Sequence, residues 1–193
     1  MARISLTPPR GLLVRFAEWY SQRNYGKILD PLKAMGHNPR VLMANARYEQ
    51  SIAKWRDLDP GLKHLAELVA AARIGCSWCM DFGHWTAQGM GMPMEKVQYV
   101  PVWREHRELF SQLELLVMEF AEAMTETEPT VTDELVERLI GELGERSFVE
   151  LTAIVAVENH RSRMNAALGL VGQGFSDQCA VRPLHAAAAS ARE

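Results

Sequence analysis

The sequence predicts an all-α protein, a single-domain helical bundle. Two observations predict this class: apolar residues recur at intervals of three and four, the period of a helix, and alternation at an interval of two hardly occurs. The chain has 193 residues, of which 48% are hydrophobic. This length and composition suffice for a buried core without a disulfide framework or a structural metal. We therefore expect one helical domain over residues 1–175 and an irregular tail over residues 176–193.

The first two helices are expected within residues 7–54. Because proline suits an opening turn, the first helix should begin at Thr7-Pro8-Pro9 and end before Gly26. Its apolar residues form one stripe: Leu12, Phe16, Trp19 and Tyr20. The second helix should run from Pro39 to Lys54. Its expected inner side consists of Val41, Tyr48, Ile52 and Trp55.

Two further helices should flank a pair of cysteines. Asp59-Pro60 is a typical helix start, and the helix that it opens should end at Gly75. Small residues in this helix, Ala70 to Ala72, would let a neighbouring helix approach closely. Cys76 follows the stop directly, and a short helix should then run to about Gln88.

The second half of the chain predicts three more helices after a proline-containing loop. The first of them carries a strong apolar stripe: Leu109, Leu113, Leu116, Val117, Phe120 and Met124. The stretch from Thr125 to Pro129 should end it, and another helix should cover Thr132 to Glu142. The run Ser147-Phe-Val-Glu150 has the form of a capping box, so it should open a long last helix that reaches Gly169.

Composition and charge exclude several classes of function. With 21 Lys and Arg against 24 Asp and Glu, the formal net charge is -3, so the chain lacks the basic field that nucleic acid selects. No apolar run approaches the ~18 residues of a membrane helix, and the N-terminus has no apolar segment of a secretory signal. We expect a cytoplasmic protein that binds neither nucleic acid nor membrane. In a reducing compartment, two cysteines that lie close together are typically redox-active or metal-binding.

The sequence Cys76-Ser77-Trp78-Cys79 places such a pair at the start of a predicted helix. Unpaired backbone N–H groups and the helix dipole stabilise a thiolate there and lower its pKa. A separation of three residues brings the two sulfurs near each other, so a sulfenic acid on one could be captured by the other as a disulfide. Redox cycling is the predicted use. The alternatives are inert packing, or a metal site that would have to recruit Cys179 and a histidine.

The run from Glu67 to His84 resembles the core of the carboxymuconolactone decarboxylase and alkylhydroperoxidase D family. The resemblance is most specific over residues 60–91 and more diffuse in residues 31–39 and 158–165. It implies the alkylhydroperoxidase D-like fold and a homo-oligomer, a dimer, trimer or hexamer. Because the peroxidase branch carries the CxxC motif, it also implies a thiol-dependent peroxidase, with Cys79 attacking a hydroperoxide and Cys76 resolving the product. A dithiol or thioredoxin-like reductant would complete the cycle without a metal or cofactor.

The chain departs from the proton relay of that family. The family places a histidine four residues after the second cysteine and a glutamate twelve before the first, where this sequence has Gly83 and His64. His84 points ~140° away from Cys79 on a regular helix, so it is a poorer candidate. His64 and Glu67 share a helix face, and we predict that His64 accepts the Cys79 proton while Glu67 orients His64.

Each of these residues also has a plainer interpretation, as a packing or surface side chain without a catalytic role. A second polar feature lies in the last helix, where a stripe changes from apolar to polar: Leu151, Val155, Glu158, Ser162 and Asn165. This end enters solvent, a subunit contact or a ligand cleft, and in a cleft Glu158 and Arg161 would bind a small polar substrate. The competing function is a helical oligomer whose relay has decayed, acting as a binding protein or as a decarboxylase or lactone-type enzyme.

Overall fold

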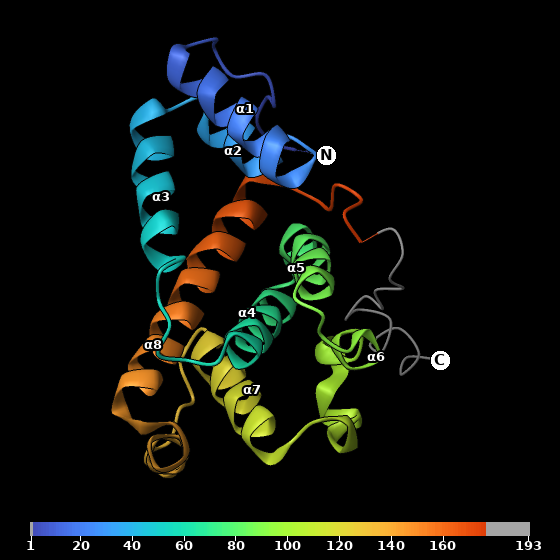
Figure 1. Cartoon of the computed structure of the whole chain (residues 1–193), viewed down its shortest axis with the longest axis vertical. Coiled ribbons are helices and arrows are strands. Elements are labelled where there is room, and N and C mark those ends of the chain that lie inside the picture. The colour runs from blue at the N-terminus through green and yellow to red at the C-terminus, as the bar shows by residue number, and fades with distance from the viewer. Residues whose placement is uncertain (1, 177–193) are drawn as a thin grey trace. The chain divides into compact units, whose positions relative to one another are not determined.

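The computed structural model describes residues 2–176, and within that range it contains helices and no strand (Figure 1). The prediction of an all-α protein is thus confirmed. The α-helices are α1 (Leu12–Tyr25), α2 (Asp30–Met35), α3 (Pro39–Ile52), α4 (Pro60–Ile74), α5 (Ser77–Gly89), α6 (Met94–Val97), α7 (Gln112–Thr125) and α8 (Asp133–Leu168), and two 3-10 helices are η1 (Val100–Glu105) and η2 (Arg107–Leu109). None of the helices in this range is long and apolar enough to cross a bilayer. Cys179 and almost all of the predicted tail lie outside the described residues.

The described residues form two compact units. The first comprises residues 2–55 and 164–171, and the second comprises residues 56–163 and 172–176. Helix α8 begins in the second unit and its last residues belong to the first. The single domain expected over residues 1–175 stays a prediction. All of the candidate site residues lie in the second unit.

In the first unit, α1 begins later than the prolines suggested. Its first residue is Leu12, because the preceding segment is extended and packs against the end of α2. There Gly36 lies so close to Pro8 that a Cβ atom on Gly36 would be 2.9 Å from the proline ring. The carbonyl of Ser5 also accepts a hydrogen bond of 2.7 Å from the His37 ring. These contacts hold the prolines outside the helix.

The apolar stripes predicted for the first unit are largely exposed. On α1, the side chains of the stripe are between 46% and 87% exposed: Leu12, Phe16, Trp19 and Tyr20. On α3, the predicted inner residues Val41 and Tyr48 are exposed and Trp55 is half-buried, whereas Ile52 is buried as expected. The covered residues of α3 are Leu42, Met43, Asn45, Glu49 and Ile52. Two of these five residues are polar, so apolar periodicity identified only Ile52 among them.

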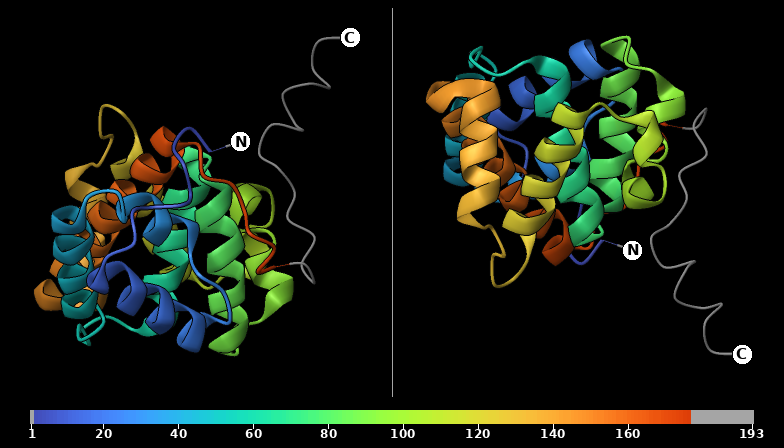
Figure 2. Two further views of the ribbon diagram at one scale, coloured as in Figure 1. Left: turned by 90° about the horizontal axis from the view of Figure 1, so that it is seen from above. Right: turned by 90° about the horizontal axis from the view of Figure 1, so that it is seen from below.

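In the second unit, α4 is the central helix and packs against α5, α7 and η1. Both views in Figure 2 show α4 and α5 side by side. The predicted start is confirmed, because the Asp59 side chain accepts hydrogen bonds from the N–H groups of Gly61 and Leu62 at 2.8 and 3.1 Å. The predicted end is confirmed as well: Gly75 has a φ of 80°, a left-handed conformation that favours glycine. Between these ends the small residues Ala70 to Ala72 are buried as expected.

Helix α7 also follows its predicted stripe. Ser111 and Glu114 form a capping box at its start, and the helix ends at Thr125 where a break was expected. Its buried residues include Leu116, Val117 and Phe120.

Helix α8 contains the two last predicted helices, joined where Gly144 leaves helical geometry with φ 76° and ψ 160°. The capping box predicted at Ser147 and Glu150 is wrong, because both residues lie inside the helix. Their side chains instead hold the segment before α4. The Ser147 hydroxyl donates to the Asp57 carbonyl at 2.8 Å, and the Glu150 carboxylate accepts from the Asp57 N–H at 2.7 Å. Glu150 also forms an ion pair with Lys63.

Candidate functional site

The cysteine pair lies at the start of α5. Cys76 is the N-cap residue, and its sulfur accepts a hydrogen bond of 3.2 Å from the backbone N–H of Cys79. The two cysteines are joined by a disulfide, with their Cα atoms 5.3 Å apart. Cys76 is 2% exposed and Cys79 is 8% exposed. The predicted proximity of the two sulfurs is confirmed, and both lie in the interior rather than on the surface.

A hydroxyl group from α8 connects Cys79 to a buried carboxylate. The Oγ atom of Ser162 lies 3.2 Å from the Cys79 sulfur and 2.7 Å from Oε1 of Glu158. Ser162 is fully buried and Glu158 is 5% exposed. Because Glu158 and Ser162 are four residues apart on one helix, they lie on the same face, and the helix holds the carboxylate next to the hydroxyl.

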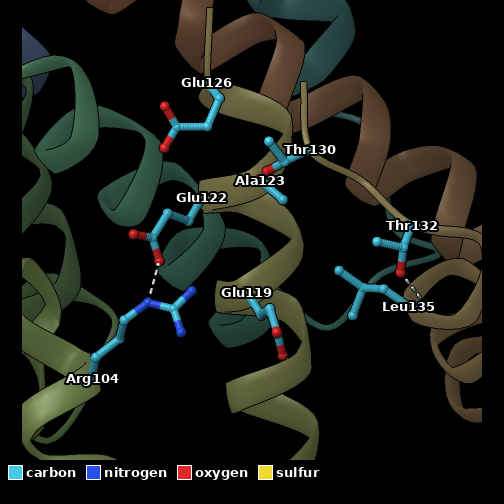
Figure 3. A pocket seen from close by; sticks show the side chains of 8 residues that line it. All are labelled: Arg104, Glu119, Glu122, Ala123, Glu126, Thr130, Thr132 and Leu135. Carbon is cyan, nitrogen blue, oxygen red and sulfur yellow. Dashed lines mark hydrogen bonds and ion pairs between the residues drawn. The ribbon is translucent and has the colours of Figure 1, made fainter. Parts of the chain in front are cut away.

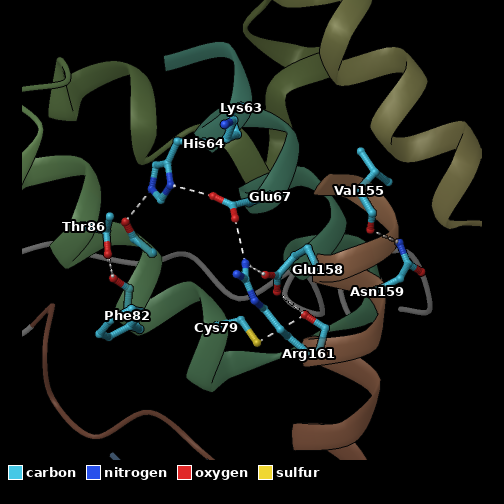
Figure 4. Close-up of polar contacts among 12 residues, drawn as sticks. Lys63, His64, Glu67, Cys79, Phe82, Thr86, Val155, Glu158, Asn159 and Arg161 are labelled. Carbon is cyan, nitrogen blue, oxygen red and sulfur yellow. Dashed lines mark hydrogen bonds and ion pairs between the residues drawn. The ribbon is translucent and has the colours of Figure 1, made fainter. Parts of the chain in front are cut away.

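The polar contacts continue from Glu158 to α4 (Figure 4). Nη1 of Arg161 lies 3.4 Å from Oε2 of Glu158 and 2.7 Å from Oε1 of Glu67. The other oxygen of Glu67 is 3.2 Å from Nδ1 of His64. Three elements, α4, α5 and α8, therefore contribute to one polar cluster around the disulfide, which we call the relay cluster: His64, Glu67, Cys79, Glu158, Arg161 and Ser162.

The His64 ring is surrounded by oxygen acceptors. Its Nδ1 faces the Glu67 carboxylate, and its Nε2 lies 2.8 Å from the backbone carbonyl of Gly83. Only the imidazolium form has two N–H donors and can satisfy both acceptors. Burial lowers the pKa of His64, but the hydrogen bond and charge of Glu67 and the Gly83 carbonyl outweigh burial and raise the pKa above 6.5. Burial opposes ionisation of Glu67 as well, yet His64 and Arg161 hold the pKa of Glu67 below its ordinary value.

Glu158 differs from Glu67 in its protonation. Burial, together with the negative charge of Glu67, raises the pKa of Glu158 to about 7 against the opposing effects of Arg161 and Ser162. A carboxyl group with this pKa is partly protonated and partly ionised near neutrality. It can therefore both accept and return a proton at physiological pH.

The structure brings His64 and Glu67 together as predicted. Gly83 stands at the position of the family's relay histidine, four residues after Cys79. A Cβ atom on Gly83 would lie 2.7 Å from Cδ2 of Leu68 and 3.9 Å from Cε1 of His64. The imidazole of His64 thus lies beside the place where the histidine of the family would be attached. The role of His64 as proton acceptor for Cys79 stays a prediction, and both of its nitrogens are already engaged by oxygen atoms.

His84 belongs to a different environment. It is 1% exposed, and its Nδ1 donates to the Met80 carbonyl at 2.7 Å on the same helix. Its Nε2 is buried without a hydrogen-bond partner, and burial lowers the pKa of the ring, which favours the neutral form of His84. Its contacts tie it to α5 itself, and none of the contacts of the relay cluster described above involves it.

A short segment after α8 holds the side of α5 next to the cysteines. Residues 172–176, which we call the strap, surround the Asp81 carboxylate with the N–H groups of Gln173, Phe175 and Ser176 at 2.6, 3.1 and 2.7 Å, and with the Ser176 hydroxyl at 2.7 Å. The Gln173 side chain accepts from the indole N–H of Trp78 at 2.9 Å. Trp78, one of the two residues between the cysteines, is therefore bound to the strap.

A separate cavity of about 190 Å³ lies beside α7 and does not include the cysteines (Figure 3). Its walls carry Glu119, Glu122 and Glu126, and Glu122 pairs with Arg104 at 2.9 Å. Within residues 2–176, no group of three or more His, Cys, Asp and Glu side chains is arranged to hold a metal ion.

Sequence reasoning did not assign a role to Ser162. The sequence feature that pointed to this region was the stripe of α8, which changes from apolar to polar and includes Ser162. From this stripe the sequence predicted only that Glu158 and Arg161 would bind a substrate. Which helix this stripe faces follows only from the packing, because Ser162 and Cys79 are 83 residues apart. The strap was missed for the same reason.

Comparison with known proteins agrees with the sequence motifs. The family model described as the carboxymuconolactone decarboxylase family matches residues 39–125, which include α4, the cysteine pair and α7. The protein YnjA of Escherichia coli (strain K12) is 30% identical over 165 residues, which are 85% of this chain and 90% of YnjA.

Solved structures share the fold at lower identity. The debrominase Bmp8 matches with a TM-score of 0.77 at 19% identity, over 90% of this chain and 94% of Bmp8. The alkylhydroperoxidase AhpD core of a peroxidase-related protein from Ralstonia eutropha JMP134 matches with a TM-score of 0.79 at 16% identity, over 90% of this chain and 94% of that chain. These structures show the fold alone. The family match and the similarity to YnjA show that the chain belongs to the carboxymuconolactone decarboxylase family.

Proposed function

We propose that the protein is a thiol-dependent peroxidase that reduces small hydroperoxides. The observation that carries this proposal is the buried Cys76–Cys79 disulfide at the start of α5, with the Cys79 sulfur in contact with the Ser162 hydroxyl. A helix start stabilises a thiolate, and a partner thiol three residues away can close a disulfide without moving the backbone far.

The proposed cycle begins with the reduced protein. The Cys79 thiolate attacks the distal oxygen of a hydroperoxide, ROOH. An S–O bond forms and the O–O bond breaks, so the sulfur is oxidised to a sulfenic acid and the alkoxide leaves with one proton as the alcohol ROH. The Cys76 thiol then attacks the sulfenic sulfur, which forms the disulfide and releases water.

An external dithiol closes the cycle. One of its thiolates attacks the Cys76–Cys79 bond, and its second thiol resolves the mixed disulfide, so the donor leaves oxidised and both cysteines are thiols again. We expect a thioredoxin-like donor, a cytoplasmic location and a homo-oligomer. The exposed apolar stripe of α1 supports self-association, because a stripe of this kind is typical of a protein contact.

The experiment measures the consumption of cumene hydroperoxide with dithiothreitol as the donor. Cys79→Ser should abolish turnover, and Cys76→Ser should slow it because the sulfenic acid has lost its resolving thiol. Cys179→Ser is the matched control and should turn over like the wild type. Full turnover by the Cys79→Ser protein would refute the proposal.

The competing function is a family member that does not reduce peroxides. It is favoured by the two altered relay positions, where His64 and Gly83 stand in place of the glutamate and histidine of the family. A protein that shows no peroxide turnover, yet releases bromide from 2,3,4-tribromopyrrole with dithiothreitol, would instead have a chemistry like that named for the debrominase Bmp8, a variant of which was crystallised with this compound.

A further inference from the structure

The Ser162 hydroxyl lies between the sulfur of Cys79 and the carboxylate of Glu158. The distances are 3.2 Å to the sulfur and 2.7 Å to Oε1 of Glu158, and both ends of this path are buried. A hydroxyl group has one proton to donate and lone pairs to accept another. The Ser162 hydroxyl can therefore pass a proton from the sulfur to the carboxylate and still keep one proton of its own. Water has little access to either group, because Cys79 and Glu158 are both buried.

We propose that Glu158, acting through Ser162, is the proton acceptor of the Cys79 thiol and the proton donor to the leaving alkoxide. This inference rests on the proposed peroxidase function. In the forward step, the thiol proton moves to Oγ of Ser162 while the Ser162 proton moves to Oε1 of Glu158. The products are a Cys79 thiolate and a neutral Glu158. After the O–O bond breaks, the same path returns this proton to RO⁻, which becomes ROH.

Both ring nitrogens of His64 already contact oxygen atoms in the relay cluster, which favours Glu158 over His64 as the acceptor of this proton. An imidazolium ring with both N–H groups bonded to Glu67 and Gly83 has no lone pair to offer. Glu67 is likewise engaged, by His64 on one oxygen and Arg161 on the other. Of the carboxylates in the cluster, Glu158 is the one in contact with the hydroxyl that reaches the sulfur.

The charges around Glu158 suit a reversible acceptor. Arg161 on its own helix favours the ionised form, and Glu67 on α4 opposes it, with the His64 charge behind Glu67. From α5, the sulfur of Cys79 contacts the Ser162 hydroxyl, which in turn contacts Glu158. Burial and the Glu67 charge leave Glu158 with a pKa of about 7, so a thiol proton can be taken and returned near neutral pH. His64 and Arg161 act through these carboxylates and are positioning residues.

The test uses the full chain with Cys76→Ser and Cys179→Ser, so that Cys79 is the remaining cysteine. In this background we compare Glu158→Gln, Ser162→Ala, the double variant and His64→Gln, with Glu145→Gln, an exposed glutamate of α8, as the matched control. The first readout is the rate of cumene hydroperoxide reduction in a single turnover between pH 5 and 9. The second is the rate of Cys79 alkylation by iodoacetamide over the same range, which requires no peroxide.

The proposal predicts that the peroxide rate of the background protein, with Glu158 and Ser162 unchanged, rises through about pH 7. Glu158→Gln and Ser162→Ala should each lower the rate at pH 7 by about 100-fold, the lower end of a general-base effect. The double variant should be no slower than either single variant, because the two groups act in series. Alkylation of Cys79 in the background protein without a further substitution should show the two steps of a coupled pair of groups, and Glu158→Gln should reduce them to one.

Two results would overturn the inference. One is a His64→Gln protein that loses the step near pH 7 while Glu158→Gln keeps it. The other is an alkylation profile that is the same in Glu158→Gln and Glu145→Gln. If no variant reduces peroxide but the alkylation profiles follow the prediction, the coupling of Cys79 to Glu158 stands and the peroxidase function fails.

Discussion

Glu158 is held in an environment that opposes its ionisation. Burial first, and then the charge of Glu67, raise its pKa from 4.5 to about 7. The folded chain therefore keeps a proton that the unfolded chain releases between these two pH values. By linkage, the stabilising contribution of the neutral Glu158 is complete below pH 4.5 and is lost as the pH rises to about 7.

Replacing Glu158 by glutamine should remove this pH dependence. From pH 5 to 6.5 the free energy of unfolding of the wild type should fall relative to that of Glu158→Gln, and the whole effect over the interval from 4.5 to about 7 corresponds to about 3 kcal/mol. Urea unfolding of wild type, Glu158→Gln and Glu145→Gln at several pH values measures it. The raised pKa of His64 adds a decline in stability only above pH 6.5, whereas the lowered pKa of His84 adds a rise in stability just below pH 6.5. Because all three proteins share both histidines, the difference between the wild type and Glu158→Gln reports Glu158. Parallel profiles for all three proteins would contradict the assignment.

At the scale of single elements, the strap and α5 are joined through one carboxylate. Burial raises the pKa of Asp81, but the hydrogen bonds from the strap outweigh it and leave the pKa below 3.8. The ring of Phe175 completes the contact, 5.3 and 5.6 Å from the rings of Phe82 and Trp85. The stabilisation from Asp81 is thus present above pH 3.8 and is lost as the pH falls through its lowered pKa.

Changing Asp81 to asparagine should release the strap. The variant keeps the shape but loses the charge, and hydrogen bonds to charged groups contribute about 1.5–3 kcal/mol. We expect faster hydrogen exchange at the N–H groups of Phe175 and Ser176, with exchange in α7 unchanged. Glu145→Gln is the control. Equal protection of these two N–H groups in Asp81→Asn and the wild type would show that the carboxylate does not hold the strap.

The break in α8 depends on one glycine. Gly144 has φ 76° and ψ 160°, a conformation that side chains with a Cβ atom rarely adopt, whereas Gly141 lies in the regular helix just before it. A Cβ atom would meet nothing within 4 Å at either position, so backbone conformation alone separates them.

The two glycines should therefore respond to alanine in opposite directions. Gly144→Ala should destabilise the protein by about 1–3 kcal/mol through backbone strain. Gly141→Ala should stabilise it by about 0.5–1 kcal/mol, because alanine favours a helix interior. Thermal unfolding of both variants measures the contrast. A Gly144→Ala protein as stable as Gly141→Ala would show that the helix can continue through residue 144.

At the scale of the whole molecule, the sequence predicts those elements whose ends are marked locally. Asp59 and Gly75 bound α4 as expected, since a cap side chain and a left-handed glycine act within a few residues. Ser147 and Glu150 carry the same kind of signal but bond to Asp57, a competitor that only the folded chain brings near. The cysteines and the His64–Glu67 pair follow from motif and helix spacing. The contact between Ser162 and Cys79 depends on how α8 packs, which periodicity does not specify.

The exposed stripe of α1 predicts self-association. Trp19 is 57% exposed in the single chain, and covering it in a homo-oligomer would remove apolar surface from water. The wild type should have a mass in solution of at least twice the chain mass of 21.7 kDa. Trp19→Glu should lower that mass, and Glu18→Gln, its neighbour, should not. Light scattering coupled to gel filtration checks this, and a monomeric wild type would refute it.

The most direct test of the account is to locate the first oxidised sulfur. Fully reduced protein carrying Cys76→Ser is mixed with one equivalent of cumene hydroperoxide and dimedone, which traps sulfenic acids, and its peptides are identified by mass spectrometry. The account predicts a dimedone adduct on Cys79 and one equivalent of cumyl alcohol. Unconsumed peroxide with no adduct on Cys79, or an adduct on Cys76 in the Cys79→Ser protein, would contradict it.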